Sequence, residues 1–179
     1  MSEEMLVCHC SPTLAGLKTG SLFSCPYSSQ KMIIKEIREF NQKLTQKGIR
    51  IIPVRISDKR MLVYVYRPEK LKEDFSDEKT QIILKCKGYD CTNLSQCICR
   101  LIQKLQSDPD FPHEIGLFLG YPAEDVKGFI ENKAACSKCS GCWKVYGDEQ
   151  AARILFKKYK KCTEIYCRRW KSGVAVEQL

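Results

Sequence analysis

The run from Met61 to Tyr66 constrains the fold more than any other segment of this chain. It is rich in β-branched and aromatic residues, here Val and Tyr, which favour an extended backbone on a half-buried sheet. A second run of this kind spans Ile49 to Ile56, and Ser57 to Arg60 between the two predicts a hairpin turn. Pro53 has no amide hydrogen to donate to a neighbouring strand, so it predicts an edge strand or a bulge. We therefore expect a small antiparallel sheet.

Several amphipathic helices accompany this sheet. The best defined runs from about Gln30 to Lys47, repeats its apolar residues at helical spacing and ends at Gly48. Further helices are predicted at Asp77 to Cys86, from Thr92 or Asn93 onward, at Ala123 to Asn132 and from Asp148 onward. Strands and helices do not alternate strictly, so the predicted class is α+β, a small, mostly antiparallel sheet with several amphipathic helices.

Three segments are harder to interpret. Met5 to Val7 predicts a short strand, and Ser11 with Pro12 predicts that a helix begins directly after it. Asp108 to Pro112 predicts a rigid loop, and His113 to Tyr121 predicts a strand that runs into a turn.

The length of 179 residues suits one folded domain with a small appendage. We expect an α+β core over residues 1–133. Residues 134–179 then form a cysteine-rich loop and a basic, helical C-terminal segment packed on the core. Thr163 to Trp170 is interpreted as a continuation of the last helix.

Twelve cysteines are many for this length but fall below the density of a disulfide scaffold. No stretch is apolar for long enough to cross a membrane, and the N-terminus lacks the features of a signal peptide. We therefore expect a cytoplasmic protein without a membrane partner, whose cysteines are thiols or metal ligands. Such cysteine usage suits an anaerobic or strongly reducing host.

Cys10 is the first candidate for chemistry. If a helix begins at Ser11, Cys10 lies at its N-terminus, where the helix dipole favours a thiolate. His113 is one of only two histidines and would serve as the base that a thiol nucleophile needs. The alternative is that Cys10 is a buried, inert cysteine beside an ordinary capped helix.

Two stretches resemble papain-like cysteine peptidases of the bacteriocin-processing type. Cys10 to Ala15 resembles their nucleophile helix, and His113 to Tyr121 resembles the strand that carries their base. The resemblance implies a hydrolase or acyl-transferring enzyme in which Asn132 or Asp125 orients His113. The chain departs from the family at Glu4, where these enzymes carry a glutamine for the oxyanion hole.

A wider resemblance joins three motifs. His9 to Lys18, Phe111 to Pro122 and Trp143 to Gly147 are together similar to an uncharacterised bacterial family, a domain of unknown function typical of anaerobic Gram-positive bacteria. This resemblance implies no activity.

A second candidate site is the C-x2-C-x2-C run of Cys136, Cys139 and Cys142. Three thiolates at this spacing suit zinc or an iron–sulfur cluster, with Cys162 or Cys167 as a fourth ligand. The alternative is a cysteine-rich surface loop without a metal. A further metal site is conceivable only if His9, Cys10, His113 and Glu114 converge.

The net charge of +9 is concentrated near the C-terminus, because Ala151 to Lys171 contains eight basic residues and one acid. A solvated helix face explains this pattern, and an acidic protein or another anionic partner is the functional alternative. Two hypotheses result: a thiol-dependent enzyme with a Cys–His pair, and a non-catalytic, cysteine-rich metal or redox protein.

Overall fold

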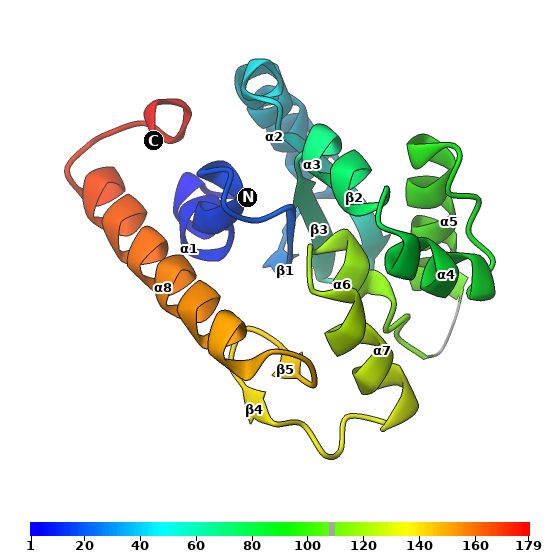
Figure 1. The fold of residues 1–179 in the computed structure, drawn as a ribbon. Helices are drawn as coiled ribbons and strands as arrows, with labels where there is room; N and C mark the ends of the chain where they lie inside the picture. The colour runs from blue at the N-terminus through cyan, green and yellow to red at the C-terminus, as the bar shows by residue number, and fades with distance from the viewer. Residues whose placement is uncertain (108–109) are drawn as a thin grey trace. The chain divides into compact units, whose positions relative to one another are not determined.

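The computed structural model describes residues 1–107 and 110–179, which form two compact units. Unit 1 consists of residues 1–69 and 159–179, and unit 2 of residues 70–158. We had expected the chain to divide after residue 133. The elements are those of an α+β protein, with many helices and a small antiparallel sheet (Figure 1). Asp108 and Pro109, which open the predicted loop, lie outside the described residues.

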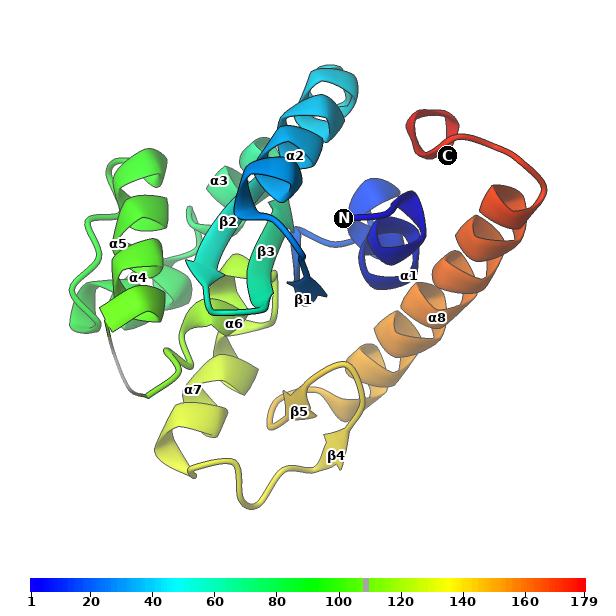
Figure 2. The same ribbon diagram turned by 180° about the vertical axis from the view of Figure 1, so that it is seen from behind.

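The sheet of unit 1 is three-stranded and antiparallel, with the order β1-β3-β2 (Figure 2). Its strands are β1 (Gly20–Pro26), β2 (Arg50–Ile56) and β3 (Arg60–Tyr66). The two predicted strands and the turn between them are confirmed, whereas β1 was not predicted. The pairing shifts register between Pro53 and Arg55, so this proline lies both in an edge strand and at a bulge.

Helix α2 (Gln30–Leu44) confirms the strongest helix prediction. It continues as the 3-10 helix η1 (Thr45–Lys47) and ends at Gly48, whose φ of +70° places it in the left-handed region. The Asn41 side chain donates to the Ile51 carbonyl at 2.7 Å and accepts from the Ile51 amide at 2.9 Å. α2 thus satisfies backbone groups of the edge strand β2 that would otherwise be open to pairing.

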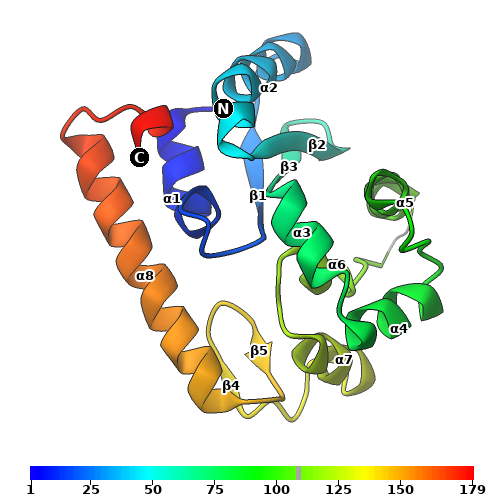
Figure 3. The same ribbon diagram turned by 45° about the horizontal axis from the view of Figure 1, so that its top comes forward.

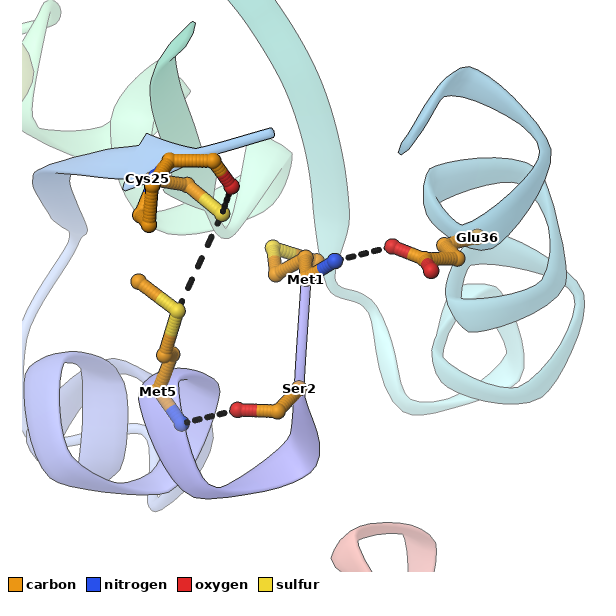
Figure 4. Close-up of polar contacts among 6 residues, drawn as sticks. Met1, Ser2, Met5, Cys25 and Glu36 are labelled. Carbon is orange, nitrogen blue, oxygen red and sulfur yellow. Dashed lines mark hydrogen bonds and ion pairs between the residues drawn. The ribbon is translucent and has the colours of Figure 1, made fainter. Parts of the chain in front are cut away.

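Helix α1 (Glu3–Leu14) overturns the predicted strand at the N-terminus and the predicted helix start at Ser11. The Ser2 hydroxyl accepts a hydrogen bond from the Met5 amide (Figure 4). Two acidic residues follow Ser2 in the first turn. This is a serine N-cap with charges that complement the helix dipole. The sequence therefore contained the correct start signal at Ser2, nine residues closer to the N-terminus than Ser11, where we placed it.

Pro12 lies in the last turn of α1 and not in its first. The helix ends at Leu14, and Gly16, two residues beyond it, has a φ of +74°. Arg67 caps the C-terminus of α1, because its guanidinium donates hydrogen bonds to the carbonyls of Thr13 at 2.7 Å and Leu14 at 2.5 Å. A cation at a helix C-terminus satisfies carbonyls that have no partner within the helix.

α1 and α2 contribute to one core with the sheet of unit 1. Helix α8 (Glu149–Lys171) confirms the helical interpretation of Thr163 to Trp170, and from Tyr159 on it belongs to this unit. It runs beside α1 (Figures 1 and 3), and Tyr166 and Trp170 pack against the core. A final 3-10 helix, η2 (Val176–Gln178), buries Val176 in the same core.

Unit 2 is built from short helices and a small hairpin. Its elements are the greater part of α3 (Pro68–Asp74), then α4 (Glu78–Cys86), α5 (Leu94–Ser107), α6 (Ile115–Phe118), α7 (Ala123–Glu131), β4 (Cys139–Ser140), β5 (Lys144–Val145) and the start of α8. The helices predicted where α4, α5, α7 and α8 lie are confirmed.

The strand predicted from His113 to Tyr121 is wrong, because the segment forms the short helix α6. The amides of Ile115, Gly116 and Leu117 donate to carbonyls three residues earlier, so the apolar run closes on itself instead of pairing with a strand. Among the described residues, no helix is both long enough and apolar enough to cross a bilayer.

Candidate functional site

The two members of the predicted Cys–His pair belong to different units. Cys10 is part of unit 1 and His113 part of unit 2, so neither unit contains the pair. Cys10 lies within α1, is 0% exposed, and belongs to the core. Its burial raises the pKa of the thiol, although Lys18 and Ser21 oppose this effect. The helix N-terminus that was to activate Cys10 is not there, and the pair itself stays a prediction.

Three of the predicted residues do share one site. His113, Asp125 and Cys142 line a cavity of about 320 Å³ within unit 2. Asn132 does not line it. This residue ends α7, where its exposed side chain donates to the Gly128 carbonyl at 2.8 Å. The cavity therefore joins candidates that we had assigned to two separate sites.

Four aromatic side chains contribute to the cavity wall. Phe111, Tyr121, Phe129 and Trp143 all line it. The rings of Tyr121 and Trp143 stack at 4.7 Å with an interplanar angle of 25°. The His113 ring meets the edge of Phe129 at 4.9 Å. These contacts hold the rings against one another and leave an apolar space beside them.

Asp125 fixes the wall that the cysteine-rich segment provides. Its carboxylate accepts hydrogen bonds from the Trp143 indole at 2.6 Å and from the amides of Tyr146 and Gly147, each at 2.7 Å. Asp125 is only 3% exposed. A carboxylate can be buried in this way because hydrogen bonds to the protein replace those to water. None of these donors is His113. The contacts of Asp125 thus serve the loop and not the imidazole.

The cysteine-rich segment is ordered around a short hairpin, in which Cys139 pairs with Val145 across β4 and β5. Three residues before or in this loop have positive φ angles although they are not glycine: Lys133, Ala134 and Cys136, at 47°, 67° and 59°. The Lys144 ammonium donates to the Ala134 carbonyl at 2.5 Å and holds this unusual backbone in place.

The metal site predicted at the thiols of this loop stays a prediction. Within residues 1–107 and 110–179, no three Cys, His, Asp or Glu side chains lie close enough together to hold an ion. Cys162, the proposed fourth ligand, is buried in unit 1, whereas Cys136, Cys139 and Cys142 belong to unit 2. The geometry thus gives no support to zinc or an iron–sulfur cluster at these thiols.

The four residues of the conceivable metal site at the two histidines are divided between the units, and this site stays a prediction. His9 stacks on Phe23 in unit 1, with 5.1 Å between ring centroids. Glu114 is buried in unit 2, where Lys104 lies 2.7 Å and the Tyr89 hydroxyl 3.1 Å from its Oε1. Burial opposes ionisation of this carboxyl, but the hydrogen bonds from Lys104 and Tyr89 prevail and lower its pKa.

Sequence reasoning missed this Lys104–Glu114–Tyr89 network, which lies next to the cavity residue His113. The Lys104 ammonium also lies over the Tyr89 ring, 4.7 Å from its centroid, and donates to the Lys87 carbonyl at 2.8 Å. No spacing rule connects residues on α5, before α5 and on the loop before α6, so the sequence carried no usable signal for the network.

The basic residues of the C-terminal segment are all exposed along α8. Arg153 forms an ion pair with Glu149 one turn earlier, which accounts for part of the charge. The acidic partner that this surface suggested stays a prediction.

Comparison with known proteins gives one result. A family model described as "Protein of unknown function (DUF3793)" matches residues 6–179. No curated protein and no solved structure matches the chain.

Proposed function

Since the chain belongs to DUF3793, a family of unknown function, we propose from its own geometry that it binds a small molecule with a flat, apolar body in the aromatic cavity of unit 2. The observation that carries this proposal is the set of four aromatic side chains around one cavity. Ligand pockets are commonly apolar and aromatic, with a few polar groups that fix orientation.

The size of the cavity limits the ligand. A volume of about 320 Å³ is at the lower end of the range for small-molecule sites, which suits a body of one or two rings. Trp143 is only 8% exposed, and one of its faces is covered by Tyr121. The ligand would therefore contact the edges and remaining faces of rings that are already fixed in place.

His113 supplies a polar group at the wall. Its ring packs on Phe129, and within the described part of the chain neither imidazole nitrogen has a hydrogen-bond partner. A neutral imidazole offers one donor and one acceptor, and a protonated one offers two donors. A ligand with a carboxylate or hydroxyl on its ring would satisfy it. An aromatic acid is thus the class that fits best.

Tryptophan emission provides a direct test. Trp170→Phe leaves Trp143 as the only tryptophan, so its fluorescence reports the cavity. In this background we expect titration with benzoate, indole-3-carboxylate or 1-naphthoate to change the emission saturably. His113→Ala should weaken binding of the acids about tenfold, the loss of roughly one charge-assisted hydrogen bond.

Ile82→Ala is the matched control, because Ile82 is an exposed residue of the same unit that does not line this cavity. It should leave the affinities unchanged. If none of the three probes changes the Trp143 emission, or if His113→Ala and Ile82→Ala weaken binding equally, the cavity is not the binding site.

A thiol-dependent acyl-transfer enzyme is the second candidate, since Cys142 and His113 line the same cavity. In this reaction His113 would accept the Cys142 proton while the sulfur attacks an acyl carbon, and would return that proton to the leaving group. Cys142 replaces Cys10 as the nucleophile because it is exposed, whereas Cys10 is buried.

The alkylation rate of Cys142 as a function of pH distinguishes this candidate from simple binding. An active pair predicts rapid reaction with iodoacetamide near neutral pH and a slower reaction in His113→Ala. Cys136 is the internal control, because it is exposed in the same loop but does not line the cavity. If Cys142 and Cys136 react at the same rate in both proteins, the enzyme candidate is wrong.

A further inference from the structure

Unit 1 contains two thiols that face each other from different helices. The Sγ atoms of Cys8 on α1 and Cys167 on α8 lie 3.8 Å apart. The two residues are 159 positions apart in sequence, so only the tertiary fold brings them together. Cys8 is exposed and Cys167 half-buried, which leaves the pair open to solvent from one side.

The packing of both helices holds the pair in place. On α1, the neighbouring Val7 is fully buried in the core. On α8, Tyr166 and Trp170 flank Cys167 on the face that packs against that core. Each thiol thus lies at the border between the packed and the exposed face of its helix, where the helices run side by side (Figures 1 and 3).

We infer that Cys8 and Cys167 form a reversible dithiol–disulfide couple that exchanges with low-molecular-weight disulfides. A disulfide needs its sulfur atoms about 2.05 Å apart, and rotation about the cysteine side chains is the natural way to close the remaining gap. The nearby thiol Cys10 is buried in the core, away from the exposed side of the pair.

The exchange proceeds in two balanced steps. The exposed Cys8 thiolate attacks one sulfur of a small disulfide, R–S–S–R, which forms Cys8–S–S–R and releases one thiolate. The Cys167 thiolate then attacks the Cys8 sulfur, which forms the Cys8–Cys167 bond and releases the second thiolate. The two protein thiols lose two protons and two electrons, and the small disulfide is reduced to two thiols.

The charges around the pair set its rate. Burial, the adjacent Cys167 thiol and Glu4 raise the pKa of Cys8, whereas Lys171 lowers it. The reaction should therefore become faster as the pH rises toward the pKa of Cys8. Arg168 and Lys171 also lie next to Cys167 and one turn beyond it on α8, where their charge favours an anionic reagent such as glutathione disulfide.

The experiment uses the full chain in glutathione buffers of increasing oxidised fraction. Free thiols are alkylated, and the protein is digested with trypsin without reduction. Cleavage after Lys18, Lys161 and Arg168 places the pair in peptides 1–18 and 162–168. We expect these two peptides to become linked as the oxidised fraction rises, and to separate again when the protein is reduced.

Each of these peptides holds a second cysteine, Cys10 or Cys162, which provides matched controls. The linked pair should disappear in Cys8→Ser and Cys167→Ser and persist in Cys10→Ser and Cys162→Ser. Fragmentation of the linked peptides from the unmodified chain assigns the bond independently of any variant, because His9 separates Cys8 from Cys10.

Three outcomes would overturn the inference. They are no linked peptide even in fully oxidised glutathione, a link that persists in Cys8→Ser or Cys167→Ser, and a glutathione adduct on Cys8 that never resolves into a bond with Cys167. Circular dichroism of each serine variant confirms that a lost link reflects the missing thiol and not an unfolded chain.

Discussion

The Trp143 indole nitrogen donates a 2.6 Å hydrogen bond to Oδ2 of Asp125. This bond connects helix α7 to the cysteine-rich segment. Both residues also line the proposed binding cavity. In the described part of unit 2, the Asp125 carboxylate holds this loop by accepting hydrogen bonds from the Trp143 indole and the amides of Tyr146 and Gly147.

Asp125→Asn should loosen this loop. An asparagine amide has one acceptor oxygen and places an NH₂ group among three donors, so at least one buried donor loses its partner. We expect a loss of about 2 kcal/mol in the free energy of unfolding. Hydrogen exchange over residues 134–147 should also accelerate.

Glu124→Gln is the matched control, because Glu124 is one residue away and forms an exposed ion pair with Lys79. It should lower the free energy of unfolding by less than about 1 kcal/mol. Equal effects of the two substitutions would contradict this role of Asp125.

Gly141→Ala should destabilise the same hairpin for a steric reason. A Cβ at this position would lie 2.3 Å from ring atoms of Phe156, closer than non-bonded carbon atoms approach. We expect a loss of about 1–3 kcal/mol, measured by chemical denaturation. The double variant Gly141→Ala with Phe156→Leu should be less destabilised than the sum of its two single variants. Strict additivity would show that the ring is not the obstacle.

The sequence predicted elements well where local patterns determine them. Helix α2, the β2–β3 hairpin and the bulge at Pro53 follow from apolar spacing and from the missing proline amide hydrogen. The start of α1 was misplaced because Ser11–Pro12 imitates an N-terminus, while the true cap at Ser2 carries a weaker pattern. A competing local signal, rather than a tertiary contact, caused this error.

The candidate site could be predicted only in part. His113, Asp125 and Cys142 were each selected, but the sequence assigned them to two different sites. The partners of Asp125 lie 18 to 22 residues further along the chain, and Cys8 and Cys167 are separated by 159 positions. Such proximity results from tertiary packing, which no periodicity in one sequence records.

The Lys104–Glu114 pair should make unit 2 sensitive to acid. Because the folded-state pKa of Glu114 is lowered from its ordinary value of 4.5, the pair stabilises the fold above that pH. This stability is lost as the pH falls through the lowered pKa. Below about pH 5, the denaturant midpoint of the unmodified chain should therefore fall with decreasing pH. The midpoint of Glu114→Gln should change less over the same range. Lys104→Met should cost about 3–5 kcal/mol near neutral pH, since it leaves a buried carboxylate without its cation. A variant Glu114→Gln with an unaltered acid profile would contradict the assignment.

Arg67→Lys should destabilise unit 1 although it keeps the positive charge. The guanidinium donates to three carbonyls, those of Thr13 and Leu14 at the end of α1 and that of Lys47 in η1. A lysine ammonium has no planar fork and cannot reach three separate carbonyls in this geometry. We expect a loss of about 1–3 kcal/mol in the free energy of unfolding, measured by chemical denaturation.

Arg55→Lys is the matched control, because Arg55 is exposed on the edge strand β2 and should change stability by less than about 0.5 kcal/mol. If both substitutions have the same small effect, the positive charge of Arg67, and not the planar geometry of its guanidinium, stabilises the ends of α1 and η1.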